Sequence, residues 1–281
     1  MNLKLMKYLC GLNQDMLLVV LQKFLITKGY KVVIKDEYLY AEGTDPVCLV
    51  AHLDTVFKQL PSEIYYDKEQ HVMWSPQGLG ADDRAGVYAI LQIVNDGYKP
   101  TIVFCKDEEV GGLGAQALVE DMPECPTELK MIIELDRQGM DDCVFYDCDN
   151  PDFERYIQQF GFTPDMGSFS DISFIAPEWK VAAVNLSVGY MNEHTYCETL
   201  HTNWLEDTIA KVETILDSVG DMPSFEYIPL VATFMPECMI CRAPLHVNNF
   251  KPVFLKGMQI NVCSECLDKY YRPDRNKALN F

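Results

Sequence analysis

The sequence predicts an α/β protein in which a mostly parallel central sheet lies between two layers of helices. Two observations predict this fold class. Four short apolar runs, at 46–52, 101–105, 130–135 and 181–187, have the composition of buried strands. Segments with a helical spacing of apolar residues lie between and beyond these runs. Strands that alternate with helices favour a parallel sheet with both faces covered, which gives a three-layer sandwich.

The other elements follow in order along the chain. An amphipathic helix is expected at 13–27, where apolar residues recur at helical spacing before Gly29 ends the segment. The alternating pattern at 31–41 predicts one strand ahead of the first apolar run. Further helices are expected at 85–95, 114–120 and 203–219.

The chain has 281 residues, enough for one sizeable α/β domain and a small appendage. We expect a main domain at 1–222, a proline-containing linker at 223–236 and a small module at 237–281. No apolar run reaches the roughly 18 residues that a membrane span needs. The N-terminal residues also lack the pattern of a signal peptide. We therefore expect a cytoplasmic protein with no membrane partner.

The formal net charge of −19 is unevenly distributed. From Leu230 to the C-terminus there are seven Lys and Arg against four Asp and Glu, a net charge of +3. The preceding residues hold the remaining 16 basic and 38 acidic side chains, a net charge of −22. Because so acidic a body repels phosphate groups, we do not expect it to bind nucleic acid.

Acidic and imidazole side chains follow each of the four predicted buried strands. In chain order they are His52 and Asp54, then Glu108 and Glu109, then Asp136, and finally His194. Ligand groups in open α/β sheets gather beyond the carboxyl ends of the parallel strands. We therefore expect these side chains to lie close together at one edge of the sheet.

Each of these segments has an ordinary structural interpretation beside a chemical one. His52 and Asp54 share one face of an extended segment, so Asp54 can orient a metal-bound imidazole or simply cap a turn. Asp82, in the turn 80–86, can cap a helix or bridge two metal ions. The acidic run within 106–112 can be a solvated loop, or a metal ligand beside the general base of a hydrolase.

Taken in order, these motifs resemble those of the zinc exopeptidase superfamily, which includes peptidase T, the glutamate carboxypeptidases and the zinc aminopeptidases. The matching segments are VAHLDTV, GLGADDRAGV, KDEEVGGLGA, the strand-terminal Asp136 and NEHTYCE. They span about half of the chain, from His52 to Glu198. The resemblance implies the phosphorylase/hydrolase-like α/β fold of that superfamily and exopeptidase-like cleavage of amide bonds.

The resemblance also implies roles for individual residues. The implied zinc ligands are His52, Asp82 and Asp136 for one ion, and Asp82, Glu109 and His194 for the other. A hydroxide bridging the two ions would be the nucleophile, with Glu108 as the general base and Asp54 as the partner of His52. This ligand set suits zinc, and manganese or cobalt could replace it.

Some features compete with this assignment or depart from it. His201 competes with His194 for the last ligand position. We favour His194 because HTYCE carries the superfamily's His followed four residues later by Glu, and we assign His201 to capping or packing. Tyr190 and Arg84 are candidate oxyanion or substrate contacts. His194 lies only 58 positions after Asp136, too few for the lid domain of about a hundred residues that many members carry. We therefore expect no lid domain.

The C-terminal module contains two CxxC pairs separated by 21 residues. The pairs Cys238/Cys241 and Cys263/Cys266 predict a tetrahedral Cys₄ site for one structural zinc ion in a zinc-ribbon-like module. The other seven cysteines are scattered and are expected as free thiols. Aromatic residues in the module favour packing or a protein partner over nucleic acid.

The sequence thus predicts a di-zinc metallohydrolase that cleaves an amide bond of a small peptide or an acylated amino acid. One alternative is a related deacylase that uses the same metals on a different amide. Another is a non-catalytic, peptidase-like binding protein that recruits partners through its zinc ribbon. The complete ligand set and the presence of Glu108 favour the enzyme.

Overall fold

The computed structural model describes residues 1–220, 222–230, 238, 240–241, 243, 250–255 and 258–270. The chain divides into two compact units, Met1–Leu230 and Val231–Phe281. Among the described residues, no helix is long and apolar enough to cross a membrane. The boundaries expected from the sequence, with a linker at 223–236, stay predictions. Phe225, within that range, is buried in the first unit.

The first unit is built on an eight-stranded sheet with the strand order β1-β2-β6-β3-β7-β10-β8-β9. The central strands β6, β3, β7 and β10 are parallel, whereas β1, β2 and β8 pair antiparallel with their inner neighbours. The sheet strands are β1 (Lys31–Ile34), β2 (Tyr38–Glu42), β3 (Asp45–His52), β6 (Pro100–Cys105), β7 (Met131–Arg137), β8 (Asp142–Val144), β9 (Thr163–Pro164) and β10 (Ala183–Ser187).

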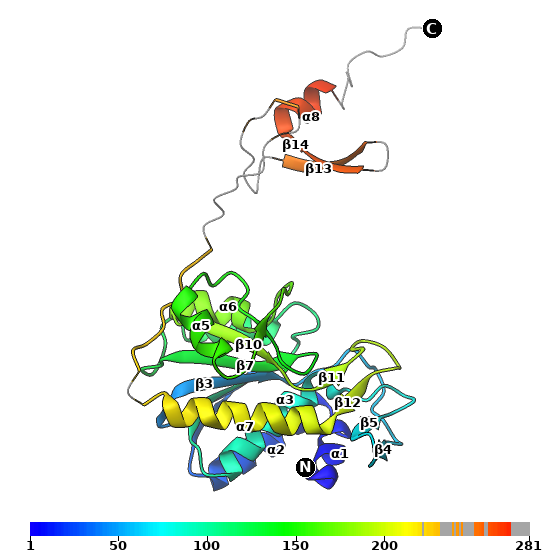
Figure 1. Cartoon of the computed structure of the whole chain (residues 1–281), viewed down its shortest axis with the longest axis vertical. Helices are drawn as coiled ribbons and strands as arrows, with labels where there is room; N and C mark the ends of the chain where they lie inside the picture. The colour runs from blue at the N-terminus through cyan, green and yellow to red at the C-terminus, as the bar shows by residue number, and fades with distance from the viewer. Residues whose placement is uncertain are drawn as a thin grey trace. The chain divides into compact units, whose positions relative to one another are not determined.

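Helices cover both faces of this sheet (Figure 1). Buried residues of α2, α3 and α7 form the larger core on one face, and those of α4 and α6 form a second core on the other. The helices of the unit are α1 (Leu3–Cys10), α2 (Gln14–Thr27), α3 (Ala81–Asn95), α4 (Leu113–Asp121), α5 (Pro151–Gln158), α6 (Ile172–Trp179) and α7 (Thr202–Ser218). The unit is therefore a three-layer α/β sandwich.

The strand β3 shows why the central strands are apolar without interruption. Leu49 and Ala51 belong to the larger core, whereas Cys48 and Val50 belong to the smaller one. Successive side chains of a strand point to opposite faces, and both faces are covered here. Every position along β3 from Val47 is therefore buried. Polar side chains can project from this strand only where it ends, which is where the candidate site lies.

A second, four-stranded antiparallel sheet has the order β11-β12-β5-β4. Its strands are β4 (Tyr65–Asp67), β5 (Val72–Trp74), β11 (Tyr190–Met191) and β12 (Thr199–His201). The strands β11 and β12 form a hairpin whose loop carries residues 192–198. This loop includes the last predicted metal ligand.

The structure confirms the α/β class and the mostly parallel sheet, and it corrects one strand. The segment 31–41 forms the hairpin β1–β2 instead of a single strand. Its polar residues Lys35, Asp36 and Glu37 form the turn, and the N–H of Lys35 donates to the carbonyl of Tyr38. Polar residues in the middle of an alternating pattern are a turn signal.

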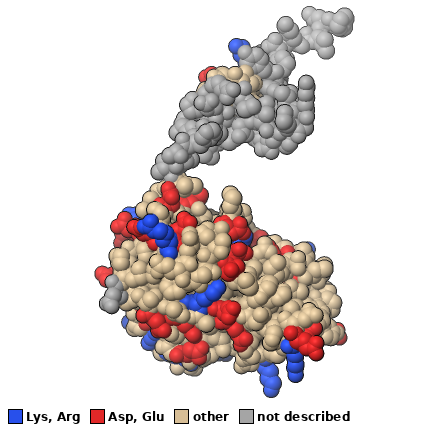
Figure 2. Space-filling model, viewed as in Figure 1, with Lys and Arg blue, Asp and Glu red and all other residues tan. Residues whose placement is uncertain are grey.

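The second unit contains the hairpin β13 (Phe250–Leu255) and β14 (Met258–Cys263), followed by α8 (Ser264–Tyr270). Cys263 ends β14 and Cys266 lies in the first turn of α8. The described surfaces of the first unit carry many Asp and Glu side chains (Figure 2). This agrees with the net charge of −22 for the residues before Leu230.

Candidate metal centre

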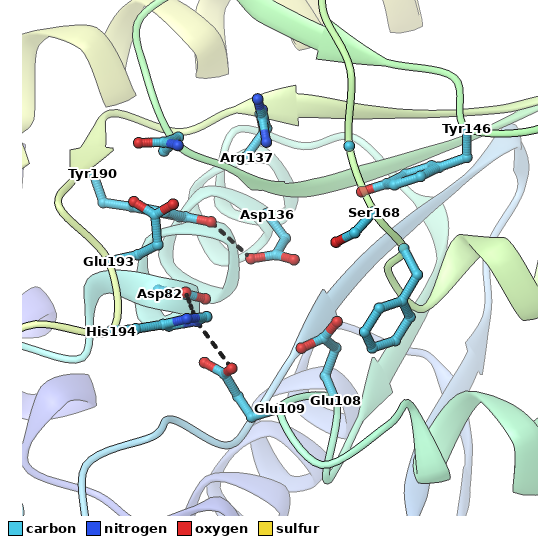
Figure 3. Close-up of a pocket in the computed structure, with 13 residues that line it drawn as sticks. Asp82, Glu108, Glu109, Asp136, Arg137, Tyr146, Ser168, Tyr190, Glu193 and His194 are labelled. Carbon is cyan, nitrogen blue, oxygen red and sulfur yellow. Dashed lines mark hydrogen bonds and ion pairs between the residues drawn. The ribbon is translucent and has the colours of Figure 1, made fainter. Parts of the chain in front are cut away.

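The parallel strands bring the predicted polar residues to one edge of the sheet. His52 is the last residue of β3, and Asp136 is the next to last residue of β7. Glu108 and Glu109 follow the end of β6, and His194 reaches the same place from the loop between β11 and β12. Figure 3 shows these side chains, apart from His52, around a pocket.

His52, Asp82 and Asp136 form the first of two groups whose donor atoms lie within 4.8 Å of one another. Nε2 of His52 lies 2.9 Å from Oδ1 of Asp82 and 3.4 Å from Oδ1 of Asp136. His52 and Asp82 are buried, and Asp136 is largely so. One imidazole and two carboxylates that converge in this way are a donor set suited to a divalent cation such as zinc.

Asp82, Glu109 and His194 form the second group. Nε2 of His194 lies 3.1 Å from Oδ2 of Asp82 and 3.0 Å from Oε2 of Glu109. Oε1 of Glu109 is buried and accepts no hydrogen bond. A buried carboxylate oxygen without a partner is unfavourable unless a cation or a water satisfies it. Unlike His52, the His194 side chain is 53% exposed, so the second group borders solvent.

Asp82 faces both groups, with one carboxylate oxygen toward each histidine. It lies in the first turn of α3, two residues after Gly80, and the peptide bond that joins it to Asp83 is cis. The carboxylate of Glu198 accepts the N–H of Gly80 at 2.6 Å and the N–H of Asp82 at 3.1 Å. Glu198 therefore holds the backbone of the residue that the two groups share.

Gly86 lets α3 approach the sheet closely. A Cβ atom at this position would lie 1.9 Å from the carbonyl oxygen of Leu135, closer than any side chain can come. The buried carboxylate of Asp83 accepts the N–H groups of Gly86 and His52. These contacts pack the DDRAG segment against β7 and β3, and they bring Asp82 between the two histidines.

Asp54 joins the ends of β3 and β6. Its Oδ1 atom lies 3.1 Å from Nδ1 of His52. Its two oxygens also accept the backbone N–H groups of Glu108 at 3.0 Å and of Glu109 at 3.1 Å. A carboxylate at Nδ1 favours the tautomer in which Nδ1 carries the proton and Nε2 is free to bind a metal. One side chain therefore positions both an imidazole and the loop that carries Glu108 and Glu109.

Three neighbours fix Asp136. Ser170 donates its hydroxyl to Oδ2 at 3.3 Å, and Tyr190 donates its hydroxyl to Oδ1 at 3.1 Å. The side chain of Asn185 accepts the N–H of Asp136 and donates to its carbonyl, both at 2.9 Å. Tyr190 is a candidate substrate or oxyanion contact from the sequence. It thus donates a hydrogen bond to a predicted metal ligand, Asp136, and it also lines the pocket.

The crowded carboxylates of the centre raise one another's pKa values and stabilise the positively charged forms of the neighbouring histidines. Burial raises the pKa of Glu108 to about 9 and that of Glu109 to about 7, and neighbouring carboxylates act in the same direction. Burial opposes the charged form of His52, but three surrounding aspartates outweigh it and hold its pKa well above the usual range. The hydrogen bond with Asp82 raises the pKa of His194 to about 9.

The residues of both groups except His52 line a pocket of about 250 Å³. Glu108 borders the same pocket without belonging to either group, and its side chain lies beside Glu109 (Figure 3). A second pocket of about 720 Å³ is also lined by His194, together with residues 56–59, 76–77 and Tyr196. His194 is therefore shared between two adjoining pockets.

The donor chemistry fits two divalent cations. Each group offers one imidazole and two carboxylates, which suit zinc and also manganese or cobalt. The carboxylate of Asp82 lies within 4.8 Å of donor atoms of both Asp136 and Glu109, and repulsion between such neighbouring carboxylates is large in a buried place. Bound cations would offset that repulsion and satisfy the unpartnered oxygen of Glu109.

The structure brings together all of the predicted metal ligands of the centre, the predicted base Glu108 and the predicted partner Asp54, while their roles stay predictions. His201 lies outside both groups, and its ring stacks on Trp204 with the centroids 3.8 Å apart. Arg84 is not a substrate contact, which corrects that expectation. It is buried, and its guanidinium donates to the backbone carbonyls of Asp54 and Leu12 instead of lining either pocket beside His194.

The sequence predicted no role for two acids within the last motif, NEHTYCE. Glu198 supports the Asp82 loop, and its place in HTYCE was the available signal for it. Glu193 lines the smaller pocket beside His194. Glu193 directly precedes His194 in the same motif, but its spacing did not distinguish it from an ordinary solvated acid.

The four cysteines of the second unit form a separate candidate metal site. Their sulfur atoms lie within 4.8 Å of one another. The Sγ atoms of Cys241 and Cys263 are 3.7 Å apart, and the N–H of Cys263 donates to Sγ of Cys238 at 3.4 Å. The N–H of Cys266 donates to Sγ of Cys263, also at 3.4 Å. Four converging thiols suit one tetrahedral zinc ion.

The fold and the site define an α/β protein with a candidate two-cation centre at the carboxyl ends of its parallel strands. A scan against protein-family models finds no match, and a search of curated proteins finds none either. Solved structures, in contrast, share the fold. The chain is similar to aminopeptidase PepT from Bacillus cereus, with 17% identity and a TM-score of 0.62 over 78% of this chain and 98% of the other.

Two further structures extend this comparison. A tripeptidase from Staphylococcus aureus has 14% identity and a TM-score of 0.65 over 78% of this chain and 98% of the other. A TET aminopeptidase from a marine sediment archaeon of the Thaumarchaeota has 12% identity and a TM-score of 0.60 over 77% of this chain and 97% of the other. At such identities the likeness shows the fold, and Met1–Leu230 is the part of this chain large enough to carry it.

Proposed function

We propose that this chain is a di-zinc hydrolase that cleaves an amide bond of a small peptide or an acylated amino acid, in the manner of an exopeptidase. The observation that carries the proposal is Asp82, whose two carboxylate oxygens face His52 and His194 in a pocket that also contains Glu108. The solved structures that share the fold are described as aminopeptidases and a tripeptidase, which supports a peptide substrate.

In this proposal the two groups of donors hold one cation each. His52, Asp82 and Asp136 would bind the first, and Asp82, Glu109 and His194 the second. When bound, such cations polarise a scissile carbonyl and lower the pKa of a water molecule. The protein contributes the spacing of its carboxylates and imidazoles, which Asp54, Glu198 and Asn185 fix through hydrogen bonds.

Glu108 is the proposed general base and general acid. It accepts a proton from the attacking water at its carboxylate, and it later gives that proton to the nitrogen of the leaving amine. The carbon–nitrogen bond breaks, and the products are a carboxylic acid and an amine. Burial raises the pKa of Glu108, which disfavours the free carboxylate, and the positive charge of cations bound beside it would lower that pKa again, so that the carboxylate is available to accept the proton.

The two pockets beside His194 provide room on both sides of the scissile bond. The smaller pocket of about 250 Å³ contains the candidate ligands and Glu108, and the larger one of about 720 Å³ adjoins it. The chain between Asp136 and His194 forms β8, α5, β9, α6, β10 and β11, all within the first unit. We propose that this compact unit acts without a lid domain, so that short substrates enter directly from solvent.

The second unit has a structural part in this proposal. Its four cysteines would hold one zinc ion as a zinc-ribbon-like module, and the metal would supply much of the free energy of folding. A protein partner is the proposed ligand of this module.

The proposed function is tested by measuring metal content and amide hydrolysis on the same preparation. We expect about three zinc ions per full chain, two in the centre and one on the cysteines, and about one in His52→Ala. The wild-type protein should hydrolyse at least one member of a set of dipeptides, tripeptides and acyl-amino acids. About one zinc ion in both proteins, with no hydrolysis after addition of zinc, cobalt or manganese, would overturn the proposal and favour a binding protein.

A further inference from the structure

Arg137 introduces a positive charge into an otherwise acidic pocket. Five of the residues that line the smaller pocket are Asp or Glu, and Arg137 is the only Lys or Arg among them. It directly follows Asp136 at the end of β7. Arg137 lines the same pocket as Asp82, Glu109, Asp136 and His194, so a group bound by Arg137 in this pocket lies close to the candidate metal centre.

The guanidinium of Arg137 is only partly used by the protein. One terminal nitrogen donates to Oδ2 of Asp165 at 2.5 Å and to the carbonyl of Met166 at 3.3 Å. Nε is buried and has no hydrogen-bond partner. A guanidinium has five N–H donors in a planar fork, and a buried donor without an acceptor is rare in folded proteins.

The position of Arg137 suits a ligand that spans the pocket. In Figure 3 Arg137 and Glu109 lie on opposite sides of Asp82 and Asp136, with the pocket beside them. The pocket of about 250 Å³ is smaller than a typical site for a drug-sized ligand, so it accepts a group of about one amino-acid residue. Such a group can contact Arg137 at one end while its amide bond lies at the centre.

We propose that Arg137 binds a carboxylate of the substrate, which defines the substrate class as peptides or acyl-amino acids with a negative charge next to the scissile amide. This inference rests on the proposed hydrolase function. The carboxylate comes either from the free C-terminus or from an acidic side chain of the residue in the smaller pocket. Arg is the side chain that matches a carboxylate with two parallel hydrogen bonds.

The charge of Arg137 explains how the site could select an anionic substrate. The first unit is strongly acidic, and five acids line the pocket itself, so an anionic substrate is repelled unless positive charge lies at the site. Arg137 supplies that charge from the protein. Its pair with Asp165 is exposed enough to exchange, because the Asp165 side chain is 49% exposed and that of Arg137 is 20% exposed.

The test measures binding to the full chain with zinc added, in a Glu108→Gln background that slows turnover. Isothermal titration calorimetry compares Ala-Ala-Ala with its C-terminal amide, and Glu-Ala-amide with Gln-Ala-amide. The first pair reports a terminal carboxylate and the second an acidic side chain. Each titration is repeated with Arg137→Gln, Arg137→Lys and the control Arg155→Gln, which changes an exposed arginine on α5.

We expect the charged member of one pair to bind about 10- to 100-fold more tightly than its neutral partner in the Glu108→Gln protein and in the Arg155→Gln control. Arg137→Gln should abolish this difference, and Arg137→Lys should restore part of it. If the difference persists in Arg137→Gln, or is absent from both pairs at the start, the inference is overturned.

Two further measurements distinguish carboxylate binding by Arg137 from a role in ordering the loop, and distinguish failure of this inference from failure of the proposed function. Asp165→Asn frees the guanidinium and should leave the carboxylate preference intact or enlarge it; a loss equal to that of Arg137→Gln would show that the ion pair only orders the loop. With Glu108 restored, hydrolysis without a carboxylate preference contradicts this inference alone. Carboxylate-selective binding without hydrolysis of any amide contradicts the proposed function alone.

Discussion

The carboxylate of Glu198 holds Asp82 through the backbone, accepting its N–H at 3.1 Å. The second oxygen of Glu198 accepts the N–H of Gly80 at 2.6 Å. Glu198 directly precedes β12, whereas Asp82 lies at the start of α3, so these bonds connect two distant parts of the chain. Because Asp82 faces both donor groups, the geometry of both depends on Glu198.

Glu198→Ala should therefore weaken metal binding in both groups at once. It leaves two buried N–H donors without acceptors, which should lower the free energy of unfolding by about 2 to 4 kcal/mol. Metal content after dialysis and urea unfolding of the zinc-loaded protein measure the two effects. The control is Glu178→Ala, an exposed acid on α6. Retention of both metals in Glu198→Ala would contradict the support that we assign to this residue.

The adjacent acids Glu108 and Glu109 should respond differently to loss of charge. Glu108→Gln should keep both metals of the centre and lower kcat by about 10²- to 10⁴-fold, since it removes only the proposed proton transfer. Glu109→Gln should lower the metal content, because Glu109 belongs to the second donor group. Metal analysis beside steady-state kinetics distinguishes the two. Near-normal turnover by Glu108→Gln would exclude it as the general base.

His194 and His201 offer a matched pair of histidine substitutions. His194→Ala should lose about one metal ion per chain, because Nε2 of His194 faces Asp82 and Glu109. His201→Ala should keep the full metal content, since that ring stacks on Trp204 outside both groups. The measurement is metal content after gel filtration. The opposite result would exchange the two assignments.

Asp54→Asn should retain the fold and weaken the centre by a moderate factor. The amide can still contact Nδ1 of His52 through its oxygen, but it loses the charge that three donors share. Substitutions that remove such a carboxylate partner cost about 10- to 100-fold in metal affinity or activity. Competition with a chelator of known affinity measures the change. An affinity equal to that of the wild type would show that Asp54 is only a turn residue.

Loss of zinc from the cysteine site of the second unit should leave the activity of the candidate metal centre unchanged. Cys263→Ser should lose about one zinc ion and expose the second unit to proteolysis, while peptide hydrolysis continues. Cys197→Ser is the control, because Cys197 is exposed and lies outside the four-cysteine group. Zinc content, limited proteolysis and activity are measured together. An unchanged zinc content in Cys263→Ser would argue against the Cys₄ site.

The central fold could be predicted because its signals are local. Buried strands such as β3 are continuous apolar runs, and their carboxyl ends are marked by residues such as His52 and Asp136. Topology then does the rest, because parallel strands end at one edge. The segment 31–41 was harder, since an alternating pattern with a polar turn can be one strand or two.

Apart from Asp54, the supports of the site could not be predicted, because they are side-chain contacts between distant segments. Ser170 and Tyr190 reach Asp136 from elements that no short motif links to β7. Arg84 lies in a motif and carries a charge, which suggested a substrate contact, but the packing of α3 buries it against backbone carbonyls. Sequence spacing indicates which residues lie near one another in the fold, but it does not give the orientation of each side chain.

The double orientation of Asp82 has a thermodynamic consequence. A cation bound at one group would change both the charge distribution and the position of the Asp82 carboxylate, which the other group also needs. Filling of the two positions is therefore linked, and the coupling free energy is equal whichever position fills first. A metal titration of this centre should not resolve into two independent hyperbolas, and the half-filled protein should have properties that neither the empty nor the full form predicts.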